Sequence, residues 1–123
     1  MKCMFLFAAA AVAALAVSTA AQADPLAGAY GNTITITQDD GTKFTAYFNA
    51  DKTWEEHHGA TVVKGTFEFK DNNQLCKTIT APAPADPAKA TSCEVAQDHK
   101  IGDTWTETSP NGKSITITIT AGR

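Results

Sequence analysis

The chain has 123 residues, 43% of them hydrophobic, and its 13 Asp and Glu residues outnumber 10 Lys and Arg residues, for a formal net charge of −3. The basic residues are scattered singly, which argues against nucleic-acid binding, because a polyanion is bound by clustered Lys and Arg. The length predicts one domain with a single core.

The first 23 residues have the three parts of a secretory signal peptide. Lys2 supplies the positive start, residues 5–17 are apolar and alanine-rich, and Ala21-Gln22-Ala23 is a small-x-small cleavage sequence. The apolar stretch is shorter than the roughly 20 residues that span a bilayer. We predict cleavage between Ala23 and Asp24, a mature domain over residues 24–123 with net charge −4, and a location in the periplasm or outside the cell.

Two cysteines remain after cleavage, because Cys3 leaves with the signal peptide. An exported protein meets oxidising conditions, and Cys76 and Cys93 lack the C-x-x-C spacing of thiolate metal sites and redox couples. We therefore predict a structural disulfide between Cys76 and Cys93. For a loop of this length, the bond is expected to stabilise the folded protein by roughly 3 kcal/mol.

Alternation with period 2 runs through the mature chain, and turn residues divide it. The predicted strands are residues 33–37, 44–48, 54–58, 63–69, 74–80, 92–96, 104–108 and 114–120. Asn111-Gly112 between the last two is a strong hairpin signal. The fold class is therefore all-β, a small antiparallel up-and-down barrel or meander of seven to eight strands. Closure into a barrel would hide its edge strands.

Aromatic residues are expected mainly in the core of this barrel, leaving room inside for at most one small ligand. They are Phe44, Phe48, Trp54, Phe67, Phe69 and Trp105. The proline-rich residues 81–90 have two interpretations, a stiff, extended recognition loop or a plain connection whose ends the disulfide holds.

Several segments resemble known proteins. The start of the mature chain, residues 24–33, resembles that of small exported bacterial β-proteins of uncharacterised function, as do the cysteine pair flanking an Ala-Pro loop and residues 102–105. More distantly, the Gly28-Ala29-Tyr30 start followed by a meander looks like lipocalin-type barrels and periplasmic inhibitors of secreted metalloproteases. Lipocalins usually have tryptophan where this chain has Tyr30.

One dense polar cluster, Glu55-Glu56-His57-His58, lies on a predicted strand. Residues two apart share a face, so Glu55 pairs with His57 and Glu56 with His58. Each pair could give an imidazole and a carboxylate to Zn²⁺ or Cu²⁺, with His99 as a third ligand. The other interpretation is an exposed polar strand end.

Strand phase predicts charged residues inside the barrel. If Trp54 points inward, so do Glu56 and His58. Trp105 likewise carries Glu107 inward, and Leu75 carries Lys77. Such side chains must be paired or gathered at an open mouth, where they would suit a small charged ligand, unless the strand ends leave the barrel and reach water.

The same phase argument gives a conflict at the cysteines. An inward Leu75 sends Cys76 outward, whereas an inward Val95 brings Cys93 inward, and two cysteines on opposite faces cannot bond. A β-bulge or an irregular sixth strand is the expected resolution.

No catalytic motif, phosphate loop or dinucleotide fingerprint is present. We therefore expect a non-enzymatic domain without a cofactor, a monomer or weak dimer that binds a small ligand or a protein partner and neither nucleic acid nor, after cleavage, a membrane. One alternative is an inhibitor of a secreted protease that uses residues 24–29 as a flexible arm. Another is a metal-binding module built on residues 55–58.

Overall fold

The computed structural model describes residues 24–109 and 111–123, and the predicted signal peptide lies outside these residues. Its strands form one antiparallel sheet, and the all-β prediction is confirmed, with each strand close to its predicted position. They are β1 (Thr33–Gln38), β2 (Lys43–Phe48), β3 (Thr53–His58), β4 (Thr61–Lys70), β5 (Gln74–Ala81), β6 (Thr91–Val95), β7 (Thr104–Thr108) and β8 (Ser114–Thr120). A 3-10 turn, η1 (Asp71–Asn73), joins β4 to β5.

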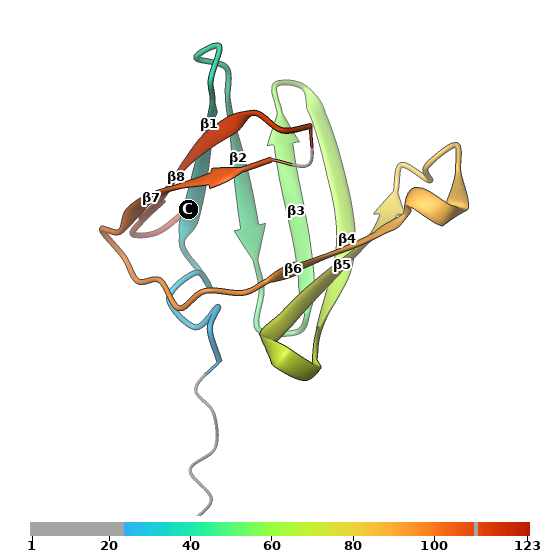
Figure 1. Ribbon diagram of the computed structural model, residues 1–123, viewed down its shortest axis with the longest axis horizontal. Helices are drawn as coiled ribbons and strands as arrows, with labels where there is room; N and C mark the ends of the chain where they lie inside the picture. Colours follow the sequence, from blue (N-terminus) through green and yellow to red (C-terminus); the bar gives the residue numbers. More distant parts are fainter. Residues whose placement is uncertain (1–23, 110) are drawn as a thin grey trace, which may run out of the picture.

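The strand order in the sheet is β6-β5-β4-β3-β2-β1-β8-β7. Consecutive strands pair from β1 to β6, and the β7–β8 hairpin joins the sheet through β8 and β1, as in an up-and-down barrel. The sheet curls into a half-barrel, with β7 and β6 at its two edges (Figure 1). The sequence left open whether the sheet closes into a barrel. In the described residues β6 and β7 do not pair with each other, so the half-barrel has an opening there.

The inner face of the sheet carries the core. Ile34 pairs with Ala46 on one side and Ile119 on the other, and Phe48 pairs with Trp54; all five side chains are buried. Of the aromatic residues predicted in the core, Phe48, Trp54 and Phe67 are buried, while Phe69 and Trp105 pack at its border. Phe44 lies outside this cluster and stacks on His58, with ring centroids 4.1 Å apart.

A glycine allows β4 and β5 to approach each other beneath the largest core side chain. A Cβ built on Gly65 would lie 1.9 Å from the carbonyl oxygen of Thr78 and 2.9 Å from the Trp54 ring. The β4–β5 register shifts between Lys64 and Gly65, and the Trp54 indole N–H donates to the Thr66 carbonyl at 2.8 Å. The site tolerates no side chain because it is filled by neighbouring backbone and indole.

The segment before β1 folds into turns that close one end of the half-barrel (Figure 1). Ala29 is fully buried, and Leu26 packs against the core. A Cβ on Gly28 would lie 2.4 Å from the carbonyl oxygen of His99, so this turn fits tightly against the connection between β6 and β7.

The predicted disulfide is confirmed: Cys76 and Cys93 are directly opposite each other in the β5–β6 pair. The phase conflict came from assuming an inward Val95, which was wrong, since Val95 is 63% exposed. Leu75 is opposite Glu94 instead, so Glu94 points inward, both cysteines lie on the outer face, and no bulge is needed between them.

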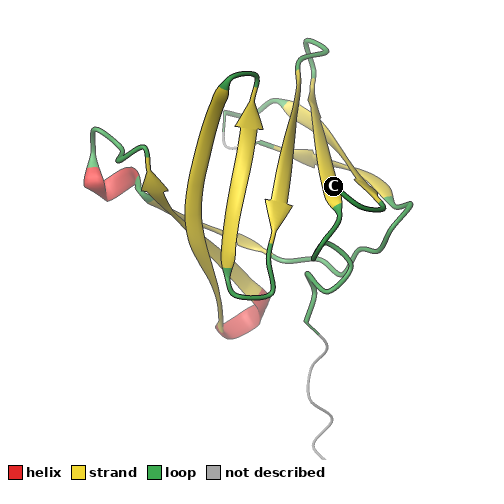
Figure 2. Ribbon diagram, turned by 180° about the vertical axis from the view of Figure 1, so that it is seen from behind, coloured by secondary structure: helices red, strands yellow, loops and turns green. Residues whose placement is uncertain are grey.

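The loop between β5 and β6 projects away from the half-barrel (Figure 2). Asp86 near its centre has extended backbone, and the loop then ends in a 3-10 turn, η2 (Pro87–Lys89), in which the Asp86 carboxylate accepts from the Ala88 amide at 3.0 Å. No helix of the described residues is long and apolar enough to cross a membrane.

Candidate functional site

The half-barrel encloses a hollow made of two adjoining pockets, of about 100 and 430 Å³. The smaller pocket lies over the apolar floor, where Ile34, Phe48 and Leu75 line it. The larger pocket extends toward the β7–β8 turn, where Ser109 and Asn111 line it. The residues that line both pockets are Ile36, Glu56, Lys77, Glu94, Glu107 and Ile117. Four of these six side chains are charged.

Glu56 and Lys77 form an ion pair inside the hollow. The Lys77 ammonium lies 3.5 Å from Glu56 Oε1 and 5.3 Å from the centre of the Trp54 ring, and both side chains are about four-fifths buried. The other Glu56 oxygen lies 3.0 Å from His58 Nε2. The structure thus brings together three residues that strand phase predicted inside, although His58 is exposed and lines neither pocket.

Trp105 and Glu107 form the wall of the hollow on the β7 side of the opening. The Trp105 indole N–H donates to Glu107 Oε1 at 2.9 Å. The His99 ring stacks on the indole with centroids 3.4 Å apart, and its Nδ1 lies 3.5 Å from Asp103 Oδ2. The inward position predicted for Glu107 is therefore reached, and His99 belongs to this wall.

Glu94 faces this wall from the opposite border of the opening, and sequence reasoning missed it. Like Ser92, which is opposite Lys77, it is an inward residue of β6; it is opposite Leu75 and lines both pockets. β6 has no alternation of apolar residues that would mark its inward side, because every one of its residues is exposed. The position of Cys93 could have revealed the inward Glu94. Cys93 bonds to the outward Cys76 and so points outward itself, and the next residue along a strand points to the opposite face.

The two histidines of the polar cluster lie on opposite faces of β3. His57 Nε2 is 2.9 Å from Glu55 Oε1, and its ring meets Tyr47 edge-on, with centroids 5.1 Å apart. The predicted pairs Glu55–His57 and Glu56–His58 are both present. In residues 24–109 and 111–123, however, no three His, Cys, Asp or Glu side chains are gathered to hold a metal ion, and His99 stacks on Trp105 instead.

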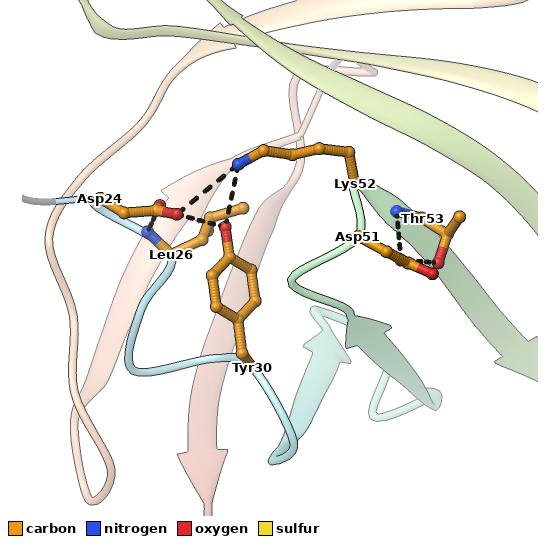
Figure 3. Close-up of polar contacts among 6 residues, drawn as sticks. All are labelled: Asp24, Leu26, Tyr30, Asp51, Lys52 and Thr53. Carbon is orange, nitrogen blue, oxygen red and sulfur yellow. Dashed lines mark hydrogen bonds and ion pairs between the residues drawn. The ribbon is translucent and has the colours of Figure 1, made fainter.

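Residues 24–29 are not a free arm, as the protease-inhibitor alternative expected. The Asp24 carboxylate accepts hydrogen bonds from the Tyr30 hydroxyl and, at 2.9 Å, from the Leu26 amide, and it lies 3.6 Å from the Lys52 ammonium (Figure 3). The Thr53 amide donates to Asp51 at 3.1 Å and fixes the turn that carries Lys52. The segment is tied to the β2–β3 turn.

These contacts change the acidity of two groups. Burial alone would raise the pKa of Asp24, but the Tyr30 hydroxyl, the Leu26 amide and the charge of Lys52 outweigh it and hold the pKa below its usual 3.8. Burial and the adjacent carboxylate raise the pKa of Tyr30 well above its usual range. The Lys52 ammonium also lies 5.3 Å and 4.9 Å from the centres of the Phe67 and Phe69 rings. The contacts of Asp24 with Lys52 therefore lie directly against the aromatic residues of the core.

We expect Asp24→Asn to lower the free energy of unfolding by about 1 kcal/mol near neutral pH, because Asp24 is one-third exposed and partly screened. A carboxyl group whose pKa is lower in the folded state stabilises the protein at pH values above its unfolded-state pKa. This stabilisation is lost as the pH falls through the folded-state pKa. The difference from the wild type should therefore shrink below about pH 4. Urea unfolding at several pH values measures it, with the exposed Asp39→Asn as control; a difference that persists in acid would contradict the assignment.

Comparison with protein-family models, curated proteins and solved structures found no match to this chain. The resemblances to exported β-proteins, lipocalins and protease inhibitors therefore stay predictions. The candidate site stands on its geometry, a hollow with an apolar floor and charged walls that opens between β6 and β7.

Proposed function

We propose that this protein is an exported, non-enzymatic binding domain of the periplasm, which holds a small ligand with an apolar body and a positively charged group. The observation that carries this proposal is the hollow of the half-barrel, with Ile34, Phe48 and Leu75 at its floor and charged side chains above them. Ligand sites are commonly concave, mostly apolar and equipped with a few polar groups that orient the ligand.

The charges of the hollow favour a cation. Its one lysine, Lys77, is already paired with Glu56. Glu94 and Glu107 remain, one on each side of the opening, and the Glu107 carboxylate is oriented by the Trp105 indole N–H. A ligand ammonium between these two strands would meet two carboxylates and the neighbouring indole ring, which attracts cations over its face.

The experiment compares three probes that share one apolar chain and differ in their head group: hexylamine, hexanol and hexanoate. Tryptophan fluorescence reports binding, because Trp105 lines the hollow and Trp54 lies beneath Lys77. We expect hexylamine to bind roughly tenfold more tightly than hexanoate, the scale of one charge-assisted hydrogen bond. Glu94→Gln with Glu107→Gln should remove this preference.

Glu68→Gln is the matched control, because Glu68 is an exposed carboxylate of β4 that lines neither pocket. It should keep the preference for the amine. Equal binding of hexylamine and hexanoate, or a preference that survives in the double variant, would refute a cation site. Native mass spectrometry of protein isolated from the periplasm would identify the natural ligand by its mass.

A further inference from the structure

The edge of β6 presents backbone groups toward the opening. In an antiparallel pair, hydrogen-bonded and non-bonded residues alternate. The Ala96 amide donates to the Asn73 carbonyl at 2.8 Å, and the Ala90 carbonyl accepts from the Ile79 amide at 2.8 Å. Even-numbered residues of β6 therefore bond to β5. The N–H and C=O groups of Thr91, Cys93 and Val95 point to the opening instead.

The β7 edge follows the same rule. The Ser109 amide donates to the Lys113 carbonyl at 2.7 Å, and the Asp103 carbonyl accepts from the Ile119 amide at 3.1 Å. Odd-numbered residues therefore bond to β8, and the backbone of Thr104, Thr106 and Thr108 faces the opening. Neither strand contains the lysine or proline that natural proteins use to protect an edge.

Of the two edges, β6 is the better platform for a further strand. All five of its residues are exposed, and the disulfide at Cys93 fixes its register against β5. On β7, by contrast, Trp105 is partly covered by the stacked His99 ring. We propose that the β6 edge binds an extended segment of a partner polypeptide, antiparallel, with lysine or arginine at alternate positions.

Charge decides the sequence of the segment. A strand beside β6 directs every second side chain into the half-barrel, next to Glu94 and toward Glu107 on the far border of the opening. Basic side chains complement these carboxylates. A second copy of this chain does not, because its own β6 and β7 bring Glu94 and Glu107 and add charge of the same sign. This recognition rests on the same two carboxylates as the small-amine proposal and adds the main-chain groups of a polypeptide, so peptides altered only at their backbone amides distinguish the two.

The register also fixes which amides of the partner form hydrogen bonds. The outward-facing Thr91, Cys93 and Val95 offer the edge groups, so the partner residues opposite them also direct their side chains to the outer face. In the probe acetyl-Thr-Lys-Thr-Lys-Thr-Lys-Thr-amide these are the threonines, while the lysines point inward. N-methylation of the threonine amides should therefore abolish binding, and N-methylation of the lysine amides should not.

Isothermal titration of the purified protein with these peptides tests the proposal, with circular dichroism to show that each variant is folded. The unmethylated probe should bind, and Val95→Pro should weaken it at least about tenfold, because proline removes an edge donor and obstructs pairing. Thr106→Pro, the matched change on the β7 edge, should leave the affinity within about twofold.

Four results would overturn the proposal. The first is that the probe does not bind, and the second is that a counterpart with glutamate in place of lysine binds equally well. The third is that Thr106→Pro loses binding while Val95→Pro is unaffected. The fourth is that N-methylation of the threonine amides and of the lysine amides has the same effect. A concentration-dependent dimer that Val95→Pro dissolves, without any effect of the peptide, would assign the edge to a second copy instead.

Discussion

Gly65→Ala is expected to lower the free energy of unfolding by about 3 kcal/mol, the upper range for overpacking a core. The added methyl group would lie 1.9 Å from the Thr78 carbonyl oxygen and 2.9 Å from Trp54. The carbonyl belongs to the β4–β5 ladder and cannot move without disturbing it, and the indole is held by its hydrogen bond to Thr66. Urea unfolding followed by tryptophan fluorescence measures the loss.

Gly59→Ala is the matched control, because it makes the same chemical change in the β3–β4 hairpin. Gly59 has a positive φ of 62° and nothing within 4 Å of its built Cβ, so alanine there meets backbone strain without a clash. We expect a cost of about 1 kcal/mol. If both variants lost the same stability, close packing at Gly65 would not be its reason for being glycine.

The strands and the disulfide were predictable because each depends on local chemistry. Apolar alternation gave the strands of the core, as in Ile34–Ile36 and Ile115–Ile119, and turn residues such as Asn111-Gly112 separated them. Strand phase then placed Glu56, Lys77 and Glu107 at one hollow, because period 2 carries a polar residue inward with its apolar neighbour.

The opening between β6 and β7 was not predictable in the same way. Whether eight strands close depends on the curvature of the sheet and on how residues 96–103 connect its two edges, and alternation encodes neither. On β6 alternation was misleading, since Val95 is its only aliphatic residue and is exposed, whereas the inward residues are the polar Ser92 and Glu94.

The tie between the first turn and the β2–β3 turn was missed for a related reason. Tyr30 lies 6 residues from Asp24 in the sequence, and Lys52 lies 28 residues from it. The three side chains meet only in the curled sheet. An acidic residue beside a predicted cleavage point offers no local sign of such a partner. The segment that the protease-inhibitor alternative treats as a flexible arm, residues 24–29, is in this structure held to the β2–β3 turn by these contacts.

Opening the Cys76–Cys93 bond should have the other large effect. The cysteines are 17 residues apart, and a loop of this size predicts a loss of about 3 kcal/mol on removal of the bond. Cys76→Ala with Cys93→Ala and the reduced wild type should give the same loss in urea unfolding. Alanine is the suitable substitute because Cys76 is only 1% exposed, and serine would bury a hydroxyl there.

A neighbouring pair on the same ladder separates the covalent bond from ordinary cross-strand contact. Thr78 and Thr91 also face each other across β5 and β6, with their hydroxyl oxygens 2.9 Å apart. Changing both to alanine should cost about 1 kcal/mol or less. A similar cost for the cysteine pair would show that the disulfide contributes little beyond such a contact.

The location of the effect is the stricter test, because β6 is an edge strand that pairs with β5 alone among the described strands. Reduction should first release β6, so the Ala96 amide, which donates to Asn73, should exchange with solvent faster while the β1–β2 ladder stays protected. Glu94 would lose its fixed position at the same time, and the preference for hexylamine should fall in the reduced protein. Uniform loss of protection across the sheet would mean that the disulfide supports the whole fold rather than this border of the hollow.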